Sequence, residues 1–231
     1  MPSAEESGHD LVNAVIERLT AARVVVDRRG HEHALFPVAI TPAEGQALRG
    51  WIERERATNT IDIGLAYAFA TLHIVDGLLA NASGAREVRH TAVDPFQSSS
   101  FAALGRRHLA EAGVADLVEV REEESQLVLP RMVTAGRSFD FAFVDGNHRF
   151  DRVFLDLVYL GRLLRPDAVA FVDDLQLRAI ARATEFFTSN RNWKVEERSA
   201  ADPEHQWIVL RTPMEPDDRG YADFCDFSII P

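Results

Sequence analysis

Hydrophobic and polar positions follow two periods from residue 59 onward, with short strand-like runs separated by longer helical ones. The strand-like runs are largely apolar or alternate, and the segments between them have helical spacing. We expect strands at TIDIG (60–64), VRHTAVD (88–94), LVEVRE (117–122), FDFAFVD (139–145) and AVAFVDD (168–174). We expect helices at 67–80, 100–112, 124–134, 149–163 and 176–188. Repeated strand–helix units predict an α/β fold, a parallel sheet with helices on both faces.

The pattern changes towards both ends of the chain. NWKVEERS (192–199) and HQWIVLRT (205–212) are strand-like with only a polar segment between them, which predicts an antiparallel pair completing the sheet. Residues 10–22 are amphipathic, and TPAEGQALRGWIERE (41–55) opens with a capping box typical of a helix start. We therefore divide the chain into an N-terminal helical extension or lid, a core and a C-terminal tail, with bounds 1–57, 58–212 and 213–231. The tail covers either an apolar patch, a dimer interface or the active site, so homo-oligomerisation stays open.

Composition narrows the class of partner. A chain of 231 residues that is 46% apolar fits one α/β domain with extensions. Its net charge of -11 disfavours nucleic acid, so we expect a small-molecule partner. Cys225 is the only cysteine, which excludes an intramolecular disulfide and suits a reducing cytoplasm. No secretory signal pattern opens the chain and no run approaches ~18 apolar residues, so we expect a soluble, cytoplasmic protein without a membrane partner.

A single lysine, Lys194, removes several enzyme classes. It lies in a strand-like segment near the C-terminus, so a P-loop GK[ST], a YxxxK oxidoreductase pair and a Schiff-base lysine near a helix are all missing. Chemistry in this chain must therefore use carboxylates, histidines and hydroxyls.

Acidic residues follow nearly every predicted strand. In open parallel sheets ligands bind outside the carboxyl ends of the strands. A single aspartate there is most often a helix cap or a turn residue. Several at one edge instead indicate a ligand site, and here they are Asp62, Asp94, Asp145, Asp173 and Asp174.

The first of these acids indicates the type of cofactor. The turn TIDIGLAYAFATL keeps one glycine, Gly64, and so lacks the GxGxxG that cradles a pyrophosphate. Asp62 would repel a pyrophosphate but attract an amine, which disfavours a nicotinamide oxidoreductase. Asp94, at the end of the next strand, can accept two hydrogen bonds from a ribose diol. An amine together with a ribose points to S-adenosylmethionine.

Five segments, in order, resemble the successive motifs of class I S-adenosylmethionine-dependent methyltransferases: IDIGLAYAFATL, HTAVDPFQ, EESQLVLP, FDFAFVDGNHRF and VAFVDDL. The resemblance covers roughly residues 55–211 and is closest to the catechol-type and sugar O-methyltransferase branches. It implies a Rossmann-like, doubly wound seven-stranded sheet, mostly parallel with an antiparallel last strand. It also implies an enzyme that methylates a hydroxyl of a small molecule such as a sugar, phenolic or polyketide-type natural product.

The resemblance also implies cofactor-binding residues. Asp62 and Gly64 would hold the methionine end of S-adenosylmethionine, and Asp94 would bind the ribose hydroxyls. Ser125 and Gln126 match residues that contact the adenine in catechol-type members. Ser125 also reads as the cap of the helix SQLVLPRM, and the two roles are compatible.

Three acids match the positions that bind magnesium in those branches: Asp145, Asp173 and Asp174. Mg²⁺ prefers hard oxygen ligands and keeps positions open for substrate oxygens, so carboxylates from adjacent strand ends suit it. A bound metal would lower the pKa of a coordinated hydroxyl. In the alternative, Asp174 caps the following helix and Asp145 orders a turn, with no metal.

The general base departs from the family pattern. Catechol-type members have a lysine three residues after the first metal-binding acid, and sugar-modifying members can have an aspartate two residues after it. Here those positions hold His148 and Asn147. A histidine with an unperturbed pKa near ~6.5 can accept a proton at neutral pH, so His148 is the base candidate beside Asp145. The alternative is a structural or solvated loop histidine.

The other histidines receive no catalytic role. HEH, at His31 and His33, has metal-like spacing but no evident third ligand, so an exposed lid is the preferred interpretation. We expect His90, His108 and His205 to be non-functional.

A second hypothesis is a non-catalytic protein that keeps the fold for binding or scaffolding. It is motivated by Ala68 and Ala70, which stand where the resembling family usually has glycine and serine.

Overall fold

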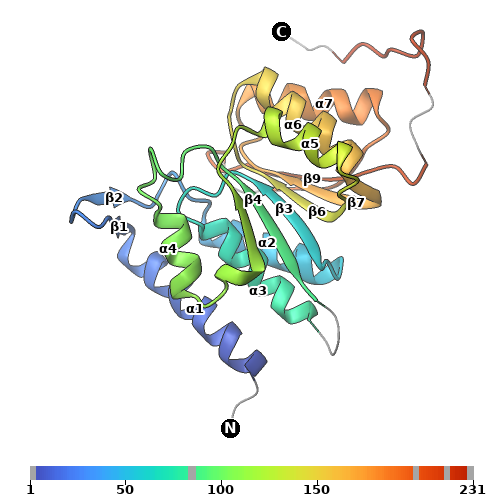
Figure 1. Cartoon of the computed structure of the whole chain (residues 1–231). Helices are drawn as coiled ribbons and strands as arrows, with labels where there is room; N and C mark the ends of the chain where they lie inside the picture. The colour runs from blue at the N-terminus through green and yellow to red at the C-terminus, as the bar shows by residue number, and fades with distance from the viewer. Residues whose placement is uncertain (1–3, 83–86, 200–202, 216–218, 228–231) are drawn as a thin grey trace. The chain divides into compact units, whose positions relative to one another are not determined.

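The computed structural model describes residues 4–82, 87–199, 203–215 and 219–227 (Figure 1). The helices are α1 (Ala4–Ala22), α2 (Pro42–Arg54), α3 (Phe69–Asn81), α4 (Leu104–Glu111), the 3-10 helix η1 (Ala115–Leu117), α5 (Ser125–Thr134), α6 (Phe150–Leu163) and α7 (Arg178–Asn190). The strands are β1 (Val24–Val26), β2 (Glu32–Ala34), β3 (Asn59–Ile63), β4 (Arg89–Val93), β5 (Val118–Arg121), β6 (Phe139–Val144), β7 (Leu164–Val172), β8 (Lys194–Arg198) and β9 (Ile208–Arg211). Within these ranges, every helix is too short or too polar to cross a bilayer.

The main sheet has seven strands in the order β5-β4-β3-β6-β7-β9-β8, and β1 with β2 forms a separate antiparallel hairpin. Strand β4 pairs in parallel with β3 and β5, and β6 pairs in parallel with β7. Strand β9 is antiparallel to both β7 and β8. The predicted fold class, a doubly wound and mostly parallel sheet with an antiparallel strand at its C-terminal end, is therefore confirmed.

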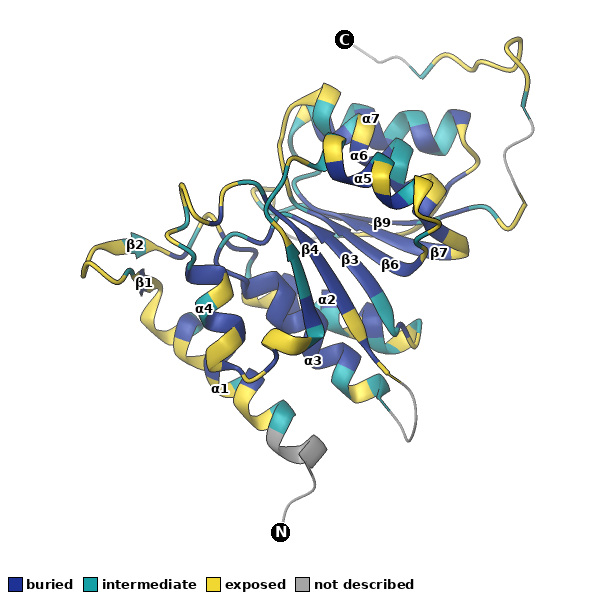
Figure 2. Ribbon diagram, viewed as in Figure 1, coloured by how far each residue is buried: buried dark blue, intermediate teal, exposed yellow. Residues whose placement is uncertain are grey.

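Contacts between residues divide the chain into two compact units, 1–125 and 126–231. In the first unit α3 packs against both α1 and α2, so that every residue from 69 to 78 is buried (Figure 2). A helix covered on nearly all sides is expected to be apolar all round, as α3 mostly is. Thr71, His73 and Asp76 are polar residues buried along with the apolar ones.

In the second unit β6 is buried at all six positions and β7 is buried from Ala168 onward. Runs without polar alternation are typical of parallel strands covered on both faces. Val144 pairs with Val172, so the residues that follow them, Asp145 and Asp173, leave neighbouring strands at the same edge. Helices α6 and α7 pack on each other, and the rings of Phe154 and Phe187 meet at a tilt of 52° with 5.7 Å between their centroids.

Two segments differ from the sequence expectation. The helix expected from residue 100 begins at Leu104, because Ala102 and Ala103 adopt positive φ of 50° and 55° and form a turn instead. The β1–β2 hairpin was not predicted. Its strands have only three residues each, too few for a period-two pattern to be visible in the sequence.

Candidate functional site

Asp62 lies near the carboxyl end of β3, and 0% of its side chain is exposed. Its Oδ2 atom accepts a hydrogen bond of 2.5 Å from the hydroxyl of Thr71 on α3, and lies 3.2 Å from Nε2 of His90 on β4. Among the residues that the structure describes, its Oδ1 atom has no hydrogen-bond partner. A buried carboxylate oxygen without a donor is costly, so Oδ1 fits the amine that the sequence analysis expects at this position.

The turn after β3 has a glycine-like backbone with few glycines. Gly64 has a φ of 111°, open mainly to glycine, and its N–H donates to the carbonyl of Val93 at 2.9 Å. Ala66 and Ala68 have φ of 43° and 64°, left-handed values that cost alanine about 1–2 kcal/mol each. Ala68 is the position where the resembling family usually has glycine, and the structure shows why glycine would suit it.

Asp94 follows β4, is 3% exposed and already has three donors from its own unit. Its Oδ1 accepts from the N–H of Phe96, and its Oδ2 accepts from the N–H of Ala66 and the amide of Gln97, all at 2.8 Å. A carboxylate offers about four acceptor positions, so about one remains for a ribose hydroxyl. Binding of both ribose hydroxyls stays a prediction and requires Gln97 to release Asp94.

Gln97 is the site residue that sequence reasoning missed. It is fully buried, and its Nε2 atom donates to the carbonyl of Ala66 at 2.7 Å as well as to Asp94. A Cβ at Gly105 would lie 2.6 Å from that carbonyl and 2.7 Å from Oε1 of Gln97, so a glycine is needed there. The available signal was an amide three residues after a strand-end acid in DPFQ, which has no general meaning on its own.

Ser125 and Gln126 are the first two residues of α5, and both are half-buried. The helix therefore starts at Ser125, as predicted, whereas the role of Ser125 as its cap stays a prediction. The expected contact of these two residues with adenine stays a prediction.

In the second unit, Asp145, His148 and Asp174 come together. One possible ligand atom from each lies within 4.8 Å of the others. Nε2 of His148 is 2.8 Å from Oδ2 of Asp174 and 3.8 Å from Oδ1 of Asp145. The two acids follow β6 and β7, and the histidine comes from the loop before α6, so the parallel pairing of the strands assembles the group.

The charges of these three side chains shift one another's pKa. The carboxylates of Asp145 and Asp174 raise the pKa of His148 to about 10. Burial raises the pKa of Asp145 to about 8. The hydrogen bond and charge of His148 act to lower this pKa, whereas the nearby carboxylates of Asp173 and Asp174 act to raise it further. Burial acts to raise the pKa of Asp174, but the hydrogen bond and charge of His148, together with the hydrogen bond from Gln176 and the charge of His205, lower it overall. In this state His148 is an imidazolium between two carboxyl groups.

Asp173 lies outside that group. It is 8% exposed, and its Oδ1 accepts a hydrogen bond of 2.6 Å from the N–H of Asp174. Asp174 has a φ of 58°, and its Oδ1 accepts from the amide of Gln176 at 2.7 Å. Of the three predicted metal ligands the structure therefore groups Asp145 and Asp174 with His148, whereas the role of Asp173 as a ligand stays a prediction.

Two carboxylates and an imidazole are a donor set that fits a divalent cation, since carboxylates suit Mg²⁺ and imidazole suits transition metals. The group Asp145, His148 and Asp174 is the one set of this kind within the described ranges.

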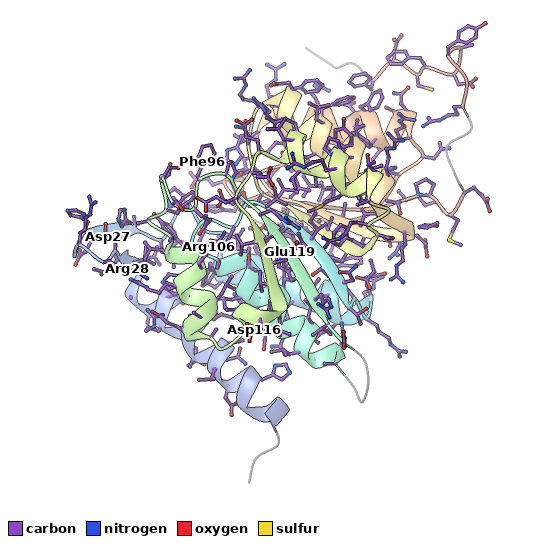
Figure 3. All side chains as sticks on the ribbon, viewed as in Figure 1. Asp27, Arg28, Phe96, Arg106, Asp116 and Glu119 are labelled. Carbon is purple, nitrogen blue, oxygen red and sulfur yellow. The ribbon has the colours of Figure 1, made fainter. Side chains whose placement is uncertain are left out.

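The histidines of HEH lie on the hairpin and both approach Asp27. Nδ1 of His31 is 3.0 Å and Nε2 of His33 is 3.4 Å from Oδ2 of Asp27, while Oδ1 accepts the N–H groups of Arg29 and His31. These bonds lower the pKa of Asp27 below its usual range, the largest contribution coming from the N–H of His31. Figure 3 marks Asp27 on this hairpin. The carboxylate of Asp27 closes the hairpin loop through its bonds to the N–H groups of Arg29 and His31.

A family model described as a methyltransferase domain matches residues 61–175. The matched stretch includes every predicted site residue: Asp62, Gly64, Asp94, Ser125, Gln126, Asp145, His148, Asp173 and Asp174. Caffeoyl-CoA O-methyltransferase 1 of Eucalyptus globulus is 27% identical over 179 residues, covering 72% of this chain and 68% of the relative. The caffeoyl-CoA O-methyltransferase of Eucalyptus gunnii is also 27% identical over 179 residues, covering 72% and 67%.

Solved structures show the same fold. An O-methyltransferase from Bacillus cereus in complex with SAH has a TM-score of 0.66 at 18% identity, covering 88% of this chain and 91% of the other. TomG, an O-methyltransferase from Streptomyces achromogenes involved in tomaymycin synthesis and solved with SAM, has a TM-score of 0.65 at 20% identity, covering 87% and 89%. The family match, the sequence likeness and the shared fold place this chain in the class I S-adenosylmethionine-dependent methyltransferases, among the O-methyltransferases.

Proposed function

We propose that this protein transfers the methyl group of S-adenosylmethionine to a hydroxyl of a small molecule, with a divalent cation, Mg²⁺, beside the accepting oxygen. The observation that carries the proposal is the group formed by Asp145, His148 and Asp174 at the ends of neighbouring strands. In an open parallel sheet this is the edge where ligands bind.

Asp62, Gly64 and Asp94, the residues expected to hold the methionine end and the ribose of the methyl donor, belong to the first unit. Oδ1 of Asp62 is a buried acceptor with no described donor, which suits the amine of the methionine end. Gly64 allows close approach of a ligand to the backbone. Asp94 keeps about one acceptor position for a ribose hydroxyl, and Ser125 and Gln126 would lie beside the adenine.

The carboxylates of Asp145 and Asp174 would hold the cation, with Asp173 as a further oxygen ligand. When bound, a divalent cation lowers the pKa of a coordinated hydroxyl and orients it towards the methyl group. These residues would therefore position the accepting oxygen, and Asp145, whose pKa burial raises to about 8, would lose its proton when the cation binds.

His148 would accept the proton of the hydroxyl. With its pKa raised to about 10 it is protonated at neutral pH and has no free lone pair at Nε2 for this task. A divalent charge held by the same carboxylates would compensate them and repel the imidazolium, which lowers the pKa of His148. The role as a base therefore belongs to the cation-loaded protein.

The acceptor we propose is a phenolic, sugar or polyketide-type natural product. Sequence relatives are named for caffeoyl-CoA, and one solved neighbour is described as acting in tomaymycin synthesis. These names favour a hydroxylated molecule of secondary metabolism. The net charge of -11 and the single cysteine suit a cytoplasmic enzyme with a small-molecule substrate.

One observation favours a second candidate, a non-catalytic protein that keeps the methyltransferase fold for binding or scaffolding. Nε2 of Gln97 donates hydrogen bonds to both the carboxylate of Asp94 and the carbonyl of Ala66. The acceptor position expected for a ribose hydroxyl is therefore partly filled. Such a protein would bind S-adenosylmethionine weakly or not at all.

Methyl transfer from labelled S-adenosylmethionine to a panel of catechols, phenols and sugars tests the proposal. We expect label in at least one hydroxylated acceptor with Mg²⁺ present, and loss of that activity in EDTA. Transfer that is insensitive to EDTA would refute the role of the cation and leave methyl transfer standing.

A further inference from the structure

We propose that His90, a residue of β4 for which the sequence suggests no role, positions the carboxyl group of Asp62 for the amine of the methyl donor. The proposal rests on the proposed function, because it needs a cofactor that carries an amine. Both side chains are 0% exposed, and both belong to the first compact unit.

The sheet register brings the two residues together. His90 pairs with Thr60 across the parallel strands β3 and β4. Thr60 and Asp62 are two residues apart on β3 and so share one face of the strand. Nδ1 of His90 lies 2.8 Å from Oγ1 of Thr60, and Nε2 lies 3.2 Å from Oδ2 of Asp62. One imidazole thus spans two oxygens of the neighbouring strand.

One arrangement of protons satisfies these contacts. A nitrogen lone pair directed at a carboxylate oxygen would be repelled, so the proton belongs on Nε2 of His90. Nδ1 then accepts from the hydroxyl of Thr60, which fixes the tautomer. Nε2 does not reach hydrogen-bond alignment with Asp62, so its attraction to Oδ2 is mainly electrostatic.

Two groups therefore hold the same oxygen of Asp62. The hydroxyl of Thr71 on α3 donates to Oδ2, and the imidazole of His90 on β4 faces it. Rotation of the carboxyl group would break both contacts. Oδ1 is left as the open acceptor of a buried carboxylate, with no donor among the described residues. A cationic amine is the donor that best compensates such an oxygen.

A purely structural role explains the arrangement less well. Burying an imidazole next to a carboxylate costs desolvation free energy, and apolar residues of similar volume commonly serve stability equally well. Loss of a structural histidine would weaken all ligands alike. Loss of a positioning histidine would weaken only the ligands whose amine meets Asp62.

Two ligands separate these roles: S-adenosylhomocysteine, which carries the amine, and 5′-methylthioadenosine, which has the same nucleoside but no amino acid part. Isothermal titration of the full chain would compare wild type with His90→Asn, Asp62→Asn and the double variant. His73→Asn is the matched control, because His73 is another buried histidine of the same unit that faces Gly45 rather than Asp62. Thermal unfolding would check that each variant is folded.

We expect His90→Asn to bind S-adenosylhomocysteine about tenfold more weakly, since a charge-assisted contact is misdirected. Its affinity for 5′-methylthioadenosine should stay unchanged, as should both affinities of His73→Asn. The double variant should bind no more weakly than Asp62→Asn, because His90 acts through Asp62. If His90→Asn does not fold, Thr60→Val removes the partner of Nδ1 instead and should show a smaller loss with the same selectivity.

An equal loss for both ligands, or no loss for either, would overturn the positioning role while the proposed function stands. Additive losses in the double variant would overturn it as well. If the wild type binds neither ligand, the cofactor assignment fails and the role of His90 fails with it.

Discussion

Nε2 of His148 lies 2.8 Å from Oδ2 of Asp174, and the same nitrogen lies 3.8 Å from Oδ1 of Asp145. One imidazolium therefore compensates two carboxyl groups that come from the ends of β6 and β7. A divalent cation bound by those carboxylates would compete with the imidazolium for them. The group thus links cation binding to the state of the histidine proposed as the base.

Replacing His148 by Gln should separate these two effects. We expect Mg²⁺ to bind several-fold more tightly, because the competing positive charge is gone. Turnover should fall by about 10²–10⁴-fold, the usual contribution of a general base. Calorimetric titration with Mg²⁺ and a methyl-transfer assay measure the two quantities. A weaker Mg²⁺ affinity would instead identify His148 as a ligand of the cation.

Asp145→Asn should abolish the dependence of activity on Mg²⁺ and lower turnover at least about 100-fold, since an amide is a poor substitute for a charged ligand. The cation-free variant should be no less stable than wild type, because burial already disfavours the charged form of Asp145 and raises its pKa to about 8. Asp151→Asn, on the exposed face of α6, is the control and should change neither property. An Asp145→Asn enzyme with normal, EDTA-sensitive turnover would disprove the assignment.

Asp94→Ala should weaken S-adenosylmethionine binding about tenfold or more, because a ribose hydroxyl loses its charged acceptor. The variant should also unfold at a lower temperature, since the N–H groups of Ala66 and Phe96 lose their partner. Asp116→Ala on η1, an exposed acid of the same unit marked in Figure 3, is the control. Fluorescence or calorimetric titration measures the affinity, and equal affinities of Asp94→Ala and wild type would exclude Asp94 from the cofactor site.

Acid should destabilise the protein through His73. Burial lowers the pKa of His73 to about 4, against the attraction of Asp76. The unfolded chain, with a histidine pKa near ~6.5, binds the proton first. Stability from this group is therefore full above that value and falls as the pH drops towards 4, by roughly 3 kcal/mol at most.

The variant His73→Leu lacks the titrating imidazole, so it should lose this dependence of stability on pH. The free energy of unfolding, followed by denaturant titration between pH 7.5 and 4.5, should fall less steeply with acid in the variant than in wild type. A difference between the two proteins that does not change with pH would show that His73 keeps its usual pKa in the fold.

The sheet was predictable because its strands are long apolar runs separated by helical patterns. The run FDFAFVD became β6, and AVAFVDD became the second half of β7. The nearness of Asp145 and Asp174 was predictable for the same reason, since parallel neighbouring strands end at one edge. The hairpin β1–β2 was missed because strands of three residues leave no readable period.

Other parts of the site depend on side-chain geometry that no spacing encodes. Gln97 reaches back to Asp94 and Ala66 only because the turn before α4 folds over the end of β4. The contact of His90 with Asp62 depends on the register of two strands that are about thirty residues apart in the chain. Sequence reasoning dismissed His90 because a lone histidine on a strand gives no sign of its partner across the sheet.

Calorimetric titration of the wild-type protein with S-adenosylmethionine, in Mg²⁺ buffer, tests the central claim most directly. We expect saturable binding at one site per chain, held by Asp62, Gly64 and Asp94. Absence of binding at millimolar S-adenosylmethionine in a folded protein would contradict the claim that this chain is a working methyltransferase.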